Sequence, residues 1–171
     1  MENDAHFEIW FDQEYRRVLS AVLVVCAGDV VRAEDATNDA FLTAYEKWHR
    51  VQAMQSPRAW VTRVAINRAK KSWRRGQRYV PLANQPEVAA TVREVDPDLW
   101  AAVGKLTFKQ RTALAMRYVE DLTQAQIADA LDVAPGTVSA TLTQARQRVR
   151  TELNGEAVSY THLTLPTIYS V

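Results

Sequence analysis

Basic side chains and one amide share a face of a predicted helix and could hold nucleic acid. Ten Lys and Arg residues lie between Glu46 and Glu87, with no acidic residue among them. At 100° per residue, spacings of i, i+4, i+7, i+8 and i+11 define a basic stripe: Arg63, Asn67, Lys70, Lys71 and Arg74. Cations neutralise phosphates, whereas the amide and the nearby Trp60 can contact unpaired bases. The stripe indicates binding of a single strand, with a merely solvated face as the alternative.

A second set of polar side chains belongs to a predicted helix-turn-helix. Residues 123–131 and 136–153 have helical periodicity, and Pro135 after a short turn is a typical helix start. Four apolar side chains would pack the second helix: Val138, Leu142, Ala145 and Val149. The outward positions would enter a DNA groove: Thr137, Ser139, Ala140, Thr143, Gln144 and Gln147. Arg146, Arg148 and Arg150 are placed for phosphates toward the end of the helix. A helical hairpin with no role in DNA binding is the alternative.

Helices must position both sets, and the sequence predicts an all-α chain. Apolar residues recur at helical spacing in three N-terminal segments, residues 6–26, 32–48 and 57–75. Ser56 and Pro57 suit the N-cap and first turn of the third helix. On that helix, Trp73 falls on the face opposite the stripe, so we expect it in the core.

Proline and a loss of periodicity divide the chain into two small helical domains. The interruption runs from about residue 76 to residue 97 and contains Pro81, Pro86 and Pro97, so it is predicted to be a linker. Helices are expected again from residue 98, and no segment of the sequence alternates like a β-strand.

The composition argues against an enzyme and against a membrane protein. The single cysteine, Cys26, excludes an internal disulfide, and its apolar neighbours predict a buried thiol. The sequence contains no glycine-rich phosphate loop, nucleophile motif or metal-ligand cluster, so we expect neither catalysis nor a cofactor. Without a signal peptide or a membrane-spanning stretch, the protein is expected to be cytoplasmic and not inserted in a membrane.

Three short strings carry a family resemblance when their order and separation are taken together. Residues 33–41 read AEDATNDAF, residues 56–69 read SPRAWVTRVAINRA, and residues 136–138 read GTV. In this arrangement the chain resembles extracytoplasmic-function (ECF) sigma factors. The resemblance implies region 2 in residues 1–79, a linker in 80–97, and region 4 in 98–155.

This resemblance implies a transcription initiation factor that recruits core RNA polymerase. Four residues of the second helix would bind the clamp of the polymerase β′ subunit: Asp35, Asn38, Asp39 and Phe41. Residues 49–56, Trp60 and the basic stripe would capture the unpaired −10 element. Residues 135–150 would bind promoter DNA at −35 and contact the β flap, and an anti-sigma factor is an expected further partner. A helix-turn-helix regulator that binds duplex DNA without polymerase is the alternative, although it needs no single-strand surface.

The sequence departs from the family pattern at several of these positions. Asn38 stands where Gln is usual, and Asp132 replaces a frequent turn glycine, which is tolerable because Asp adopts left-handed backbone more readily than most residues. The family often has a basic residue among the positions of Ser139, Ala140 and Thr141. Their lack of charge predicts weaker phosphate anchoring at −35.

The last residues, 156–171, differ in character from everything before them. From residue 158 onward there is no charge and no helical face, and β-branched residues are frequent. Back-translated, residues 158–167 resemble the mosaic-end adaptor of transposase-based sequencing libraries, so we expect a non-native tail from adaptor read-through. Helical order is expected to end near residues 153–155, because Asn154 and Gly155 form a stop signal. A native extension that folds on a partner is the alternative.

Overall fold

The computed structural model describes residues 2–75 and 96–156, and within these ranges every regular element is a helix. The prediction of an all-α chain is therefore confirmed. Most of the predicted linker and nearly all of the predicted non-native tail lie outside the described residues. Among the described helices, none combines the length and apolar character needed to cross a membrane.

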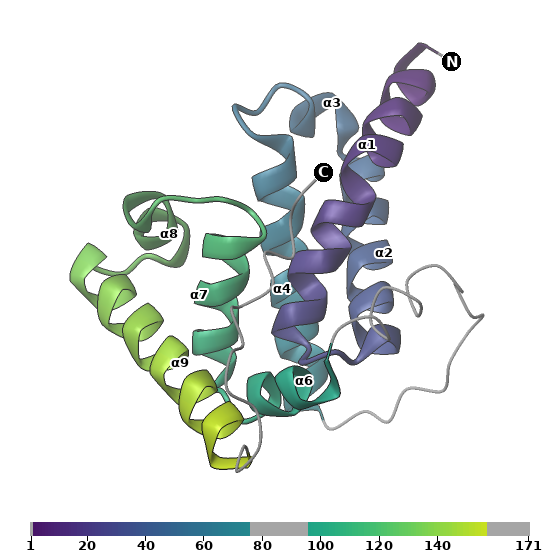
Figure 1. The fold of residues 1–171 in the computed structure, drawn as a ribbon. Helices are drawn as coiled ribbons and strands as arrows, with labels where there is room; N and C mark the ends of the chain where they lie inside the picture. Colours follow the sequence, from purple (N-terminus) through teal and green to yellow (C-terminus); the bar gives the residue numbers. More distant parts are fainter. Residues whose placement is uncertain (1, 76–95, 157–171) are drawn as a thin grey trace.

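The N-terminal unit is a bundle of three long helices and one short one (Figure 1). It consists of α1 (Glu2–Val25), α2 (Val30–Glu46), α3 (Trp48–Val51) and α4 (Pro57–Arg74). The Asp29 side chain caps α2 by accepting from the Arg32 amide, and the Ser56 hydroxyl caps α4 by accepting from the Ala59 amide. The short helix α3 occupies part of residues 49–56, where the sequence predicted only a loop.

Aromatic rings fill one end of this bundle. Phe41 of α2 is only 2% exposed, and its ring centroid lies 5.0–5.5 Å from the rings of Trp10, Phe11 and Tyr15 on α1. Trp48 of α3 closes the same cluster against Trp10, at 4.9 Å. Pairs of this kind stabilise beyond their buried area, by about 0.5–1.5 kcal/mol each. The aromatic cluster therefore fixes α2 and α3 on α1.

The C-terminal unit contains α6 (Pro97–Gly104), α7 (Phe108–Tyr118), α8 (Gln124–Leu131) and α9 (Pro135–Glu156). Reciprocal capping boxes start two of these helices, Thr107 with Gln110 for α7 and Thr123 with Gln126 for α8. Asp132 ends α8 in the left-handed conformation, with φ 52°, as its place in the turn predicted. At its far end α9 continues through Gly155 to Glu156, slightly beyond the predicted stop.

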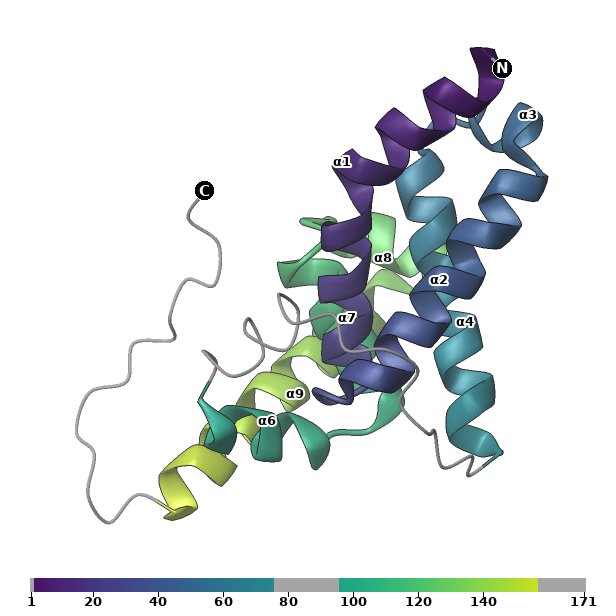
Figure 2. The ribbon, with the colours of Figure 1, turned by 90° about the vertical axis from the view of Figure 1, so that its right-hand side faces the viewer.

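The two units pack against each other through α1 and α7, which lie side by side (Figure 2). Ala21 and Val25 of α1 and Ile66 of α4 join a buried cluster made mainly by the C-terminal unit, including Met116 and Ile127. The second core is therefore not confined to the second half of the chain. Each unit contributes part of the apolar surface that the other buries.

Arginines fasten both ends of this junction to backbone carbonyls. Arg111, only 2% exposed, donates from Nε to the Val25 carbonyl at 2.7 Å and from Nη1 to the Leu106 carbonyl at 2.6 Å. At the other end, Arg17 donates to the Val119 carbonyl at 3.3 Å.

Gly28, with φ 82°, lies so close to Trp100 that a Cβ would come within 3.0 Å of the ring. The break between α1 and α2 is thereby shaped to receive α6.

A buried carboxylate adds a charged contact beside these bonds. Glu120 has a side chain only 3% exposed and pairs with Arg58 of α4 at 3.1 Å, while Arg58 also reaches Glu14 of α1 at 3.3 Å. Burial raises the pKa of Glu120, and the nearby Arg58 and Arg17 offset only part of that effect. The ion pair with Arg58 therefore holds the Glu120 carboxylate in a buried position that disfavours its ionised form.

Replacing Arg111 by Met should lower the free energy of unfolding by about 2–4 kcal/mol, because two buried carbonyls lose a charged donor. Urea unfolding followed by circular dichroism measures the loss. Lys109→Met on the exposed side of the same helix is the matched control and should change stability little. Equal stability of the two variants would contradict the anchoring role of Arg111.

Glu120→Gln should gain stability relative to the unchanged chain as the pH rises. The folded state raises the pKa of Glu120 above the ordinary 4.5, so ionising this carboxyl costs folding free energy from that pH upward through the raised pKa. Gln carries no such cost and can still accept from Arg58. Thermal melts at about pH 4.5 and about pH 7.5 measure the difference, with Asp129→Asn on the exposed side of α8 as control. A relative gain by the unchanged chain at the higher pH would refute this account.

Candidate nucleic-acid interface

The basic stripe is an exposed face of α4. All five members are exposed, whereas Val61, Ala65 and Ala69 on the opposite side are buried in the bundle. Capping by Ser56 fixes where the helix begins, and the apolar positions fix its rotation about its axis. Among the residues described here, no hydrogen bond or ion pair engages a side chain of the stripe. Its cations and its amide are thus available to a partner.

The two tryptophans near the stripe differ in their surroundings. Trp60 is partly buried and packs against the core of the N-terminal unit, near the start of α4. The prediction that Trp73 is core is wrong, because this residue is 47% exposed. Trp73 lies in the last turn of α4, where its ring centroid is 5.0 Å from the guanidinium of Arg32 and 4.9 Å from that of Arg111. At this end of the bundle the ring meets cations of α2 and α7 in place of apolar side chains.

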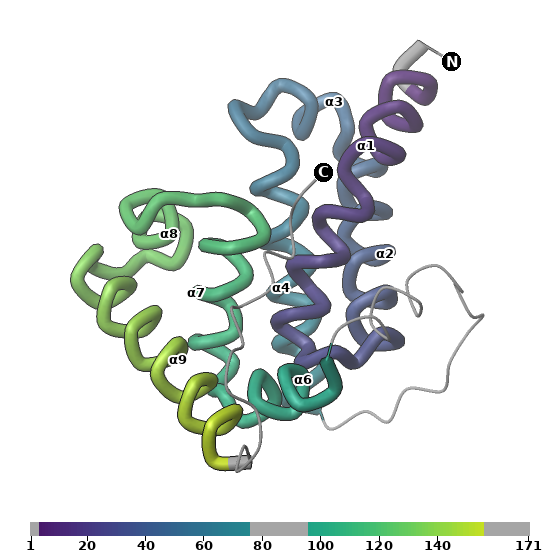
Figure 3. The backbone as a smooth tube through the Cα atoms, viewed as in Figure 1, coloured from purple at the N-terminus to yellow at the C-terminus, as the bar shows by residue number. Residues whose placement is uncertain are grey.

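The outward face of α9 forms a second polar surface. Val138, Leu142, Ala145 and Val149 are buried as predicted, which leaves the other side of α9 exposed along the outer edge of the C-terminal unit (Figure 3). All the predicted readout positions there are exposed except Thr137, which is intermediate.

Hydrogen bonds distinguish the candidates on this face. The Thr143 hydroxyl donates to the Ser139 carbonyl at 2.9 Å, and Arg146 donates to the Tyr118 hydroxyl at 3.1 Å. The amide of Gln144 has no such bond among the described residues, so both its donor and its acceptor can meet the edge of a base.

The third predicted surface lies on α2 and only partly matches the expected set. Asp35, Asn38 and Asp39 are exposed, and the Asn38 amide oxygen accepts from the Tyr15 hydroxyl at 2.8 Å. Phe41, predicted to stand beside the acidic pair, lies inside the aromatic cluster and is not on this surface. The adjacent Leu42 is 58% exposed instead. The helical spacing of Ala33, Ala40 and Ala44 already predicts Phe41 on the inner side of α2, so its assignment to the clamp contact rested on the family resemblance alone.

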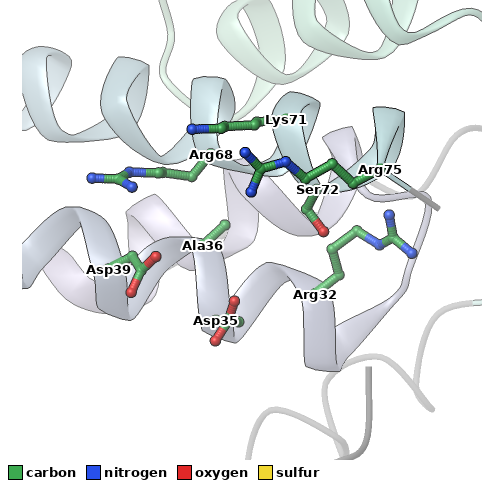
Figure 4. A pocket seen from close by; sticks show the side chains of 8 residues that line it. All are labelled: Arg32, Asp35, Ala36, Asp39, Arg68, Lys71, Ser72 and Arg75. Atoms are coloured by element: carbon green, nitrogen blue, oxygen red, sulfur yellow. The ribbon is translucent and has the colours of Figure 1, made fainter. Parts of the chain in front are cut away.

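A groove between α2 and α4 connects this surface with the basic stripe (Figure 4). Asp35 and Asp39 line it from α2, and Arg68, Lys71 and Arg75 line it from α4. Arg68 and Arg75 belong to the ten basic residues between Glu46 and Glu87, but their spacing predicted no site for them. Their proximity to α2 could not be read from the spacing of α4 alone.

Within the described part of the chain, no group of His, Cys, Asp and Glu side chains is arranged to hold a metal ion.

The sequence matches two protein-family models that together span most of the described chain. Residues 10–79 match sigma-70 region 2, and residues 97–149 match sigma-70 region 4. The RNA polymerase sigma-E factor of Streptomyces avermitilis is 31% identical over 158 residues, which cover 87% of this chain and 88% of that protein. The sigma-E factor of Streptomyces coelicolor is 34% identical over 73% of each chain.

Solved structures show the same fold. The sigma factor RpoE from Bartonella quintana, in complex with the anti-sigma factor NepR, aligns with a TM-score of 0.70 at 19% identity, covering 88% of this chain and 98% of that one. CnrH in complex with the cytosolic domain of CnrY aligns with a TM-score of 0.63 at 18% identity, covering 90% and 91%.

Proposed function

This chain belongs to the ECF group of the sigma-70 family, and we propose which of its surfaces carry out promoter-specific initiation. It binds core RNA polymerase and directs it to promoters. The assignment is carried by one observation: the exposed polar faces of α2, α4 and α9 lie in the segments that match regions 2 and 4. The alternative of a regulator without polymerase is not favoured, because it leaves the region 2 match unexplained. We further propose that the protein catalyses nothing itself and acts in the cytoplasm, where polymerase meets the promoter.

The proposed contact with the β′ clamp is made by Asp35, Asn38 and Asp39 on α2. Two exposed carboxylates one helical turn apart present negative charge to a basic partner. Phe41 would support this contact from inside, because its ring holds α2 in place on α1.

The proposed −10 surface consists of the basic stripe, with Trp60 and residues 49–56 at its N-terminal end. The cations would follow the phosphates of the opened strand, and Asn67 would hydrogen-bond to a base. Trp60 is only partly buried, so part of its side chain remains available to a base.

The proposed −35 surface is the outward face of α9, which would enter the major groove in the manner of a recognition helix. Gln144 is the strongest candidate for base readout because a free amide can pair bidentately with adenine. Arg146 and Gln147 lie further along the same face, where we propose contacts to phosphates. The same unit would also contact the β flap.

The two relatives of known structure were each captured with an anti-sigma factor or its cytosolic domain. We propose that this chain is also controlled by an anti-sigma factor, which would stabilise an inactive arrangement of the two units. Such a partner would compete with core polymerase for this chain, which a binding assay with the fluorescently labelled chain can measure. A candidate that binds without competing would not fill this role.

Asp39→Arg should weaken the affinity for core polymerase by about tenfold or more, because it replaces attraction with repulsion at the clamp contact. Fluorescence anisotropy of the labelled chain with core enzyme measures the change. Asp12→Arg, an equal charge change on the exposed side of α1, is the control. Normal affinity of Asp39→Arg, with an unchanged melting curve, would remove α2 from the contact.

The two DNA surfaces should respond differently to single substitutions. Gln144→Ala should relax selectivity at one −35 position, at a cost of about 1–3 kcal/mol for the lost bidentate pair. Lys70→Ala should weaken binding about equally across sequences and reduce the salt slope by roughly one. Selection from a promoter library by the reconstituted holoenzyme measures the −35 preference, and binding to one promoter at several salt concentrations measures the salt slope. An unchanged −35 preference with Gln144→Ala would show that another face of α9 reads the DNA.

Simultaneous use of both DNA surfaces requires the two units to separate. The −10 and −35 elements are about 25 base pairs apart, which is roughly 85 Å at about 3.4 Å per base pair. A compact chain of this size has a radius of gyration of only roughly 15 Å. The arrangement in which the two units pack together, held by Arg111 and Glu120, is therefore too small to span the promoter. We propose that polymerase stabilises an open arrangement in which the two units are separated.

Distance measurement between spin labels at Ala59→Cys on α4 and Asp129→Cys on α8 can follow this separation. Selective labelling is feasible, because burial raises the pKa of the Cys26 thiol to about 12. The distance should be short in the free chain and longer by tens of ångströms with core polymerase and promoter DNA, on the basis of the spacing above. A short distance in an initiating complex would contradict the opening.

A further inference from the structure

The first half of α9 carries no positive charge with which to hold DNA. Residues 135–145 contain neither Lys nor Arg, and Arg146 is the first cation of the helix. Contacts to backbone phosphates fix the register of a recognition helix on the duplex, although they carry no sequence information themselves. A helix without cations in its first turns therefore needs a phosphate contact further along, and Arg146 is the first side chain that can make one.

Arg146 lies on the border between the exposed and the buried side of α9. Ser139, Thr143 and Arg146 recur at i, i+4 and i+7, so they form one row along the helix. Leu142 and Ala145 beside this row are buried in the clusters that α9 shares with α7 (Figure 1). The Arg146 side chain therefore leaves α9 at the edge of its exposed face. With a recognition helix in a groove, the backbone of the duplex passes beside the helix at such an edge.

The last residue of α7 receives this side chain. Tyr118 is 46% exposed, and its hydroxyl accepts from Nη1 of Arg146 at 3.1 Å. Met116 and Val119 on either side of it are buried, at 4% and 5%, and they hold the end of α7 in the core of the C-terminal unit. The guanidinium of Arg117 lies 5.9 Å from the Tyr118 ring and brings a second positive charge to the same place.

A hydroxyl held in this way prepares the arginine for a further partner. A long exposed side chain samples many rotamers, and a bond to a fixed group reduces the conformational entropy that is lost when a ligand binds. The guanidinium has five N–H donors, and the bond to Tyr118 uses one of them. Within residues 2–75 and 96–156 Arg146 forms no ion pair, so its charge and its other donors are available to an anion.

We propose that Tyr118 is a positioning residue, which holds Arg146 toward one phosphate of the DNA backbone beside the −35 element. The proposal rests on the proposed function, because α9 has to lie in the major groove at −35. It identifies a contact between α7 and α9 that anchors a recognition helix whose first turns are uncharged. Because a phosphate carries no base identity, this anchor contributes to the affinity and not to the −35 preference.

A double-mutant cycle tests the positioning role. Tyr118→Phe keeps the ring and removes the hydroxyl, and it should weaken promoter binding by the reconstituted holoenzyme by about three- to tenfold. The loss should be the same for promoters that differ in their −35 sequence. In the Arg146→Ala background, Tyr118→Phe should change the affinity by less than about twofold, because the group that it positions is gone. An equal loss in both backgrounds, or no loss in either, would overturn the proposal.

Salt dependence separates a phosphate contact from an effect on the fold. Arg146→Ala should reduce the salt slope of promoter binding by roughly one, with an unchanged melting curve. Lys109→Ala removes an equal charge from an exposed position near the start of α7 and should leave the slope unchanged. Equal slopes for Arg146→Ala and Lys109→Ala would show that Arg146 meets no phosphate and would contradict the proposal.

Uncharged methylphosphonates, placed one at a time beside the −35 element, locate the contact. With the unchanged chain, replacement of one particular phosphate should weaken binding. The same replacement should have no effect on Arg146→Ala and a smaller effect on Tyr118→Phe than on the unchanged chain. If every replacement affects the three proteins equally, the anchor does not exist.

Gln144→Ala tells failure of this proposal from failure of the proposed function. If Gln144→Ala changes the −35 preference while Tyr118→Phe leaves the affinity unchanged, α9 reads the DNA without this anchor and only the positioning proposal is wrong. If Gln144→Ala, Tyr118→Phe and Arg146→Ala all leave −35 binding unchanged, the assignment of α9 to the −35 element is itself wrong.

Discussion

The guanidinium of Arg111 donates to a carbonyl at the end of α1 and to another at the end of the turn before α7, with almost no exposure to solvent. A buried guanidinium has to be satisfied, and here both acceptors are backbone groups that lie at helix ends. The bond to Val25 is possible only when α7 lies along α1, so it specifies how the two helical units meet. The shared apolar cluster and the Arg58–Glu120 pair then form around that arrangement.

The junction uses faces that the proposed partners do not need. It engages the C-terminal half of α1 and the buried side of α4, while the outer faces of α2, α4 and α9 remain exposed. The docked arrangement therefore covers neither of the proposed DNA surfaces, and on that proposal it would oppose initiation by keeping the two surfaces too close together. Burial raises the pKa of Glu120, so ionising this carboxyl costs stability at the junction, which suits the opening proposed above.

Charge in this protein is organised by helix, although the net charge of the chain is only +1. The outer face of α2 is acidic, and the facing wall and outer face of α4 are basic. Close packing of the two helices turns two ordinary solvated faces into adjacent surfaces for partners of opposite sign. On the proposed assignment, polymerase and promoter DNA would be bound side by side on one small bundle, because the acidic surface repels DNA and the basic surface repels a basic partner.

The sequence by itself determined the long helices, the cap of α4 at Ser56 and the rotation of α4 and α9, because local spacing and capping residues decide these features. It also identified the family, from three strings in a fixed order. Only the tertiary structure decided that Trp73 lies under two guanidinium groups and that Arg111 is internal. The groove of Arg68 and Arg75 against Asp35 and Asp39 was likewise invisible to spacing. In each case the surroundings of a side chain are set by a helix distant in sequence, and periodicity within one helix carries no information about that neighbour.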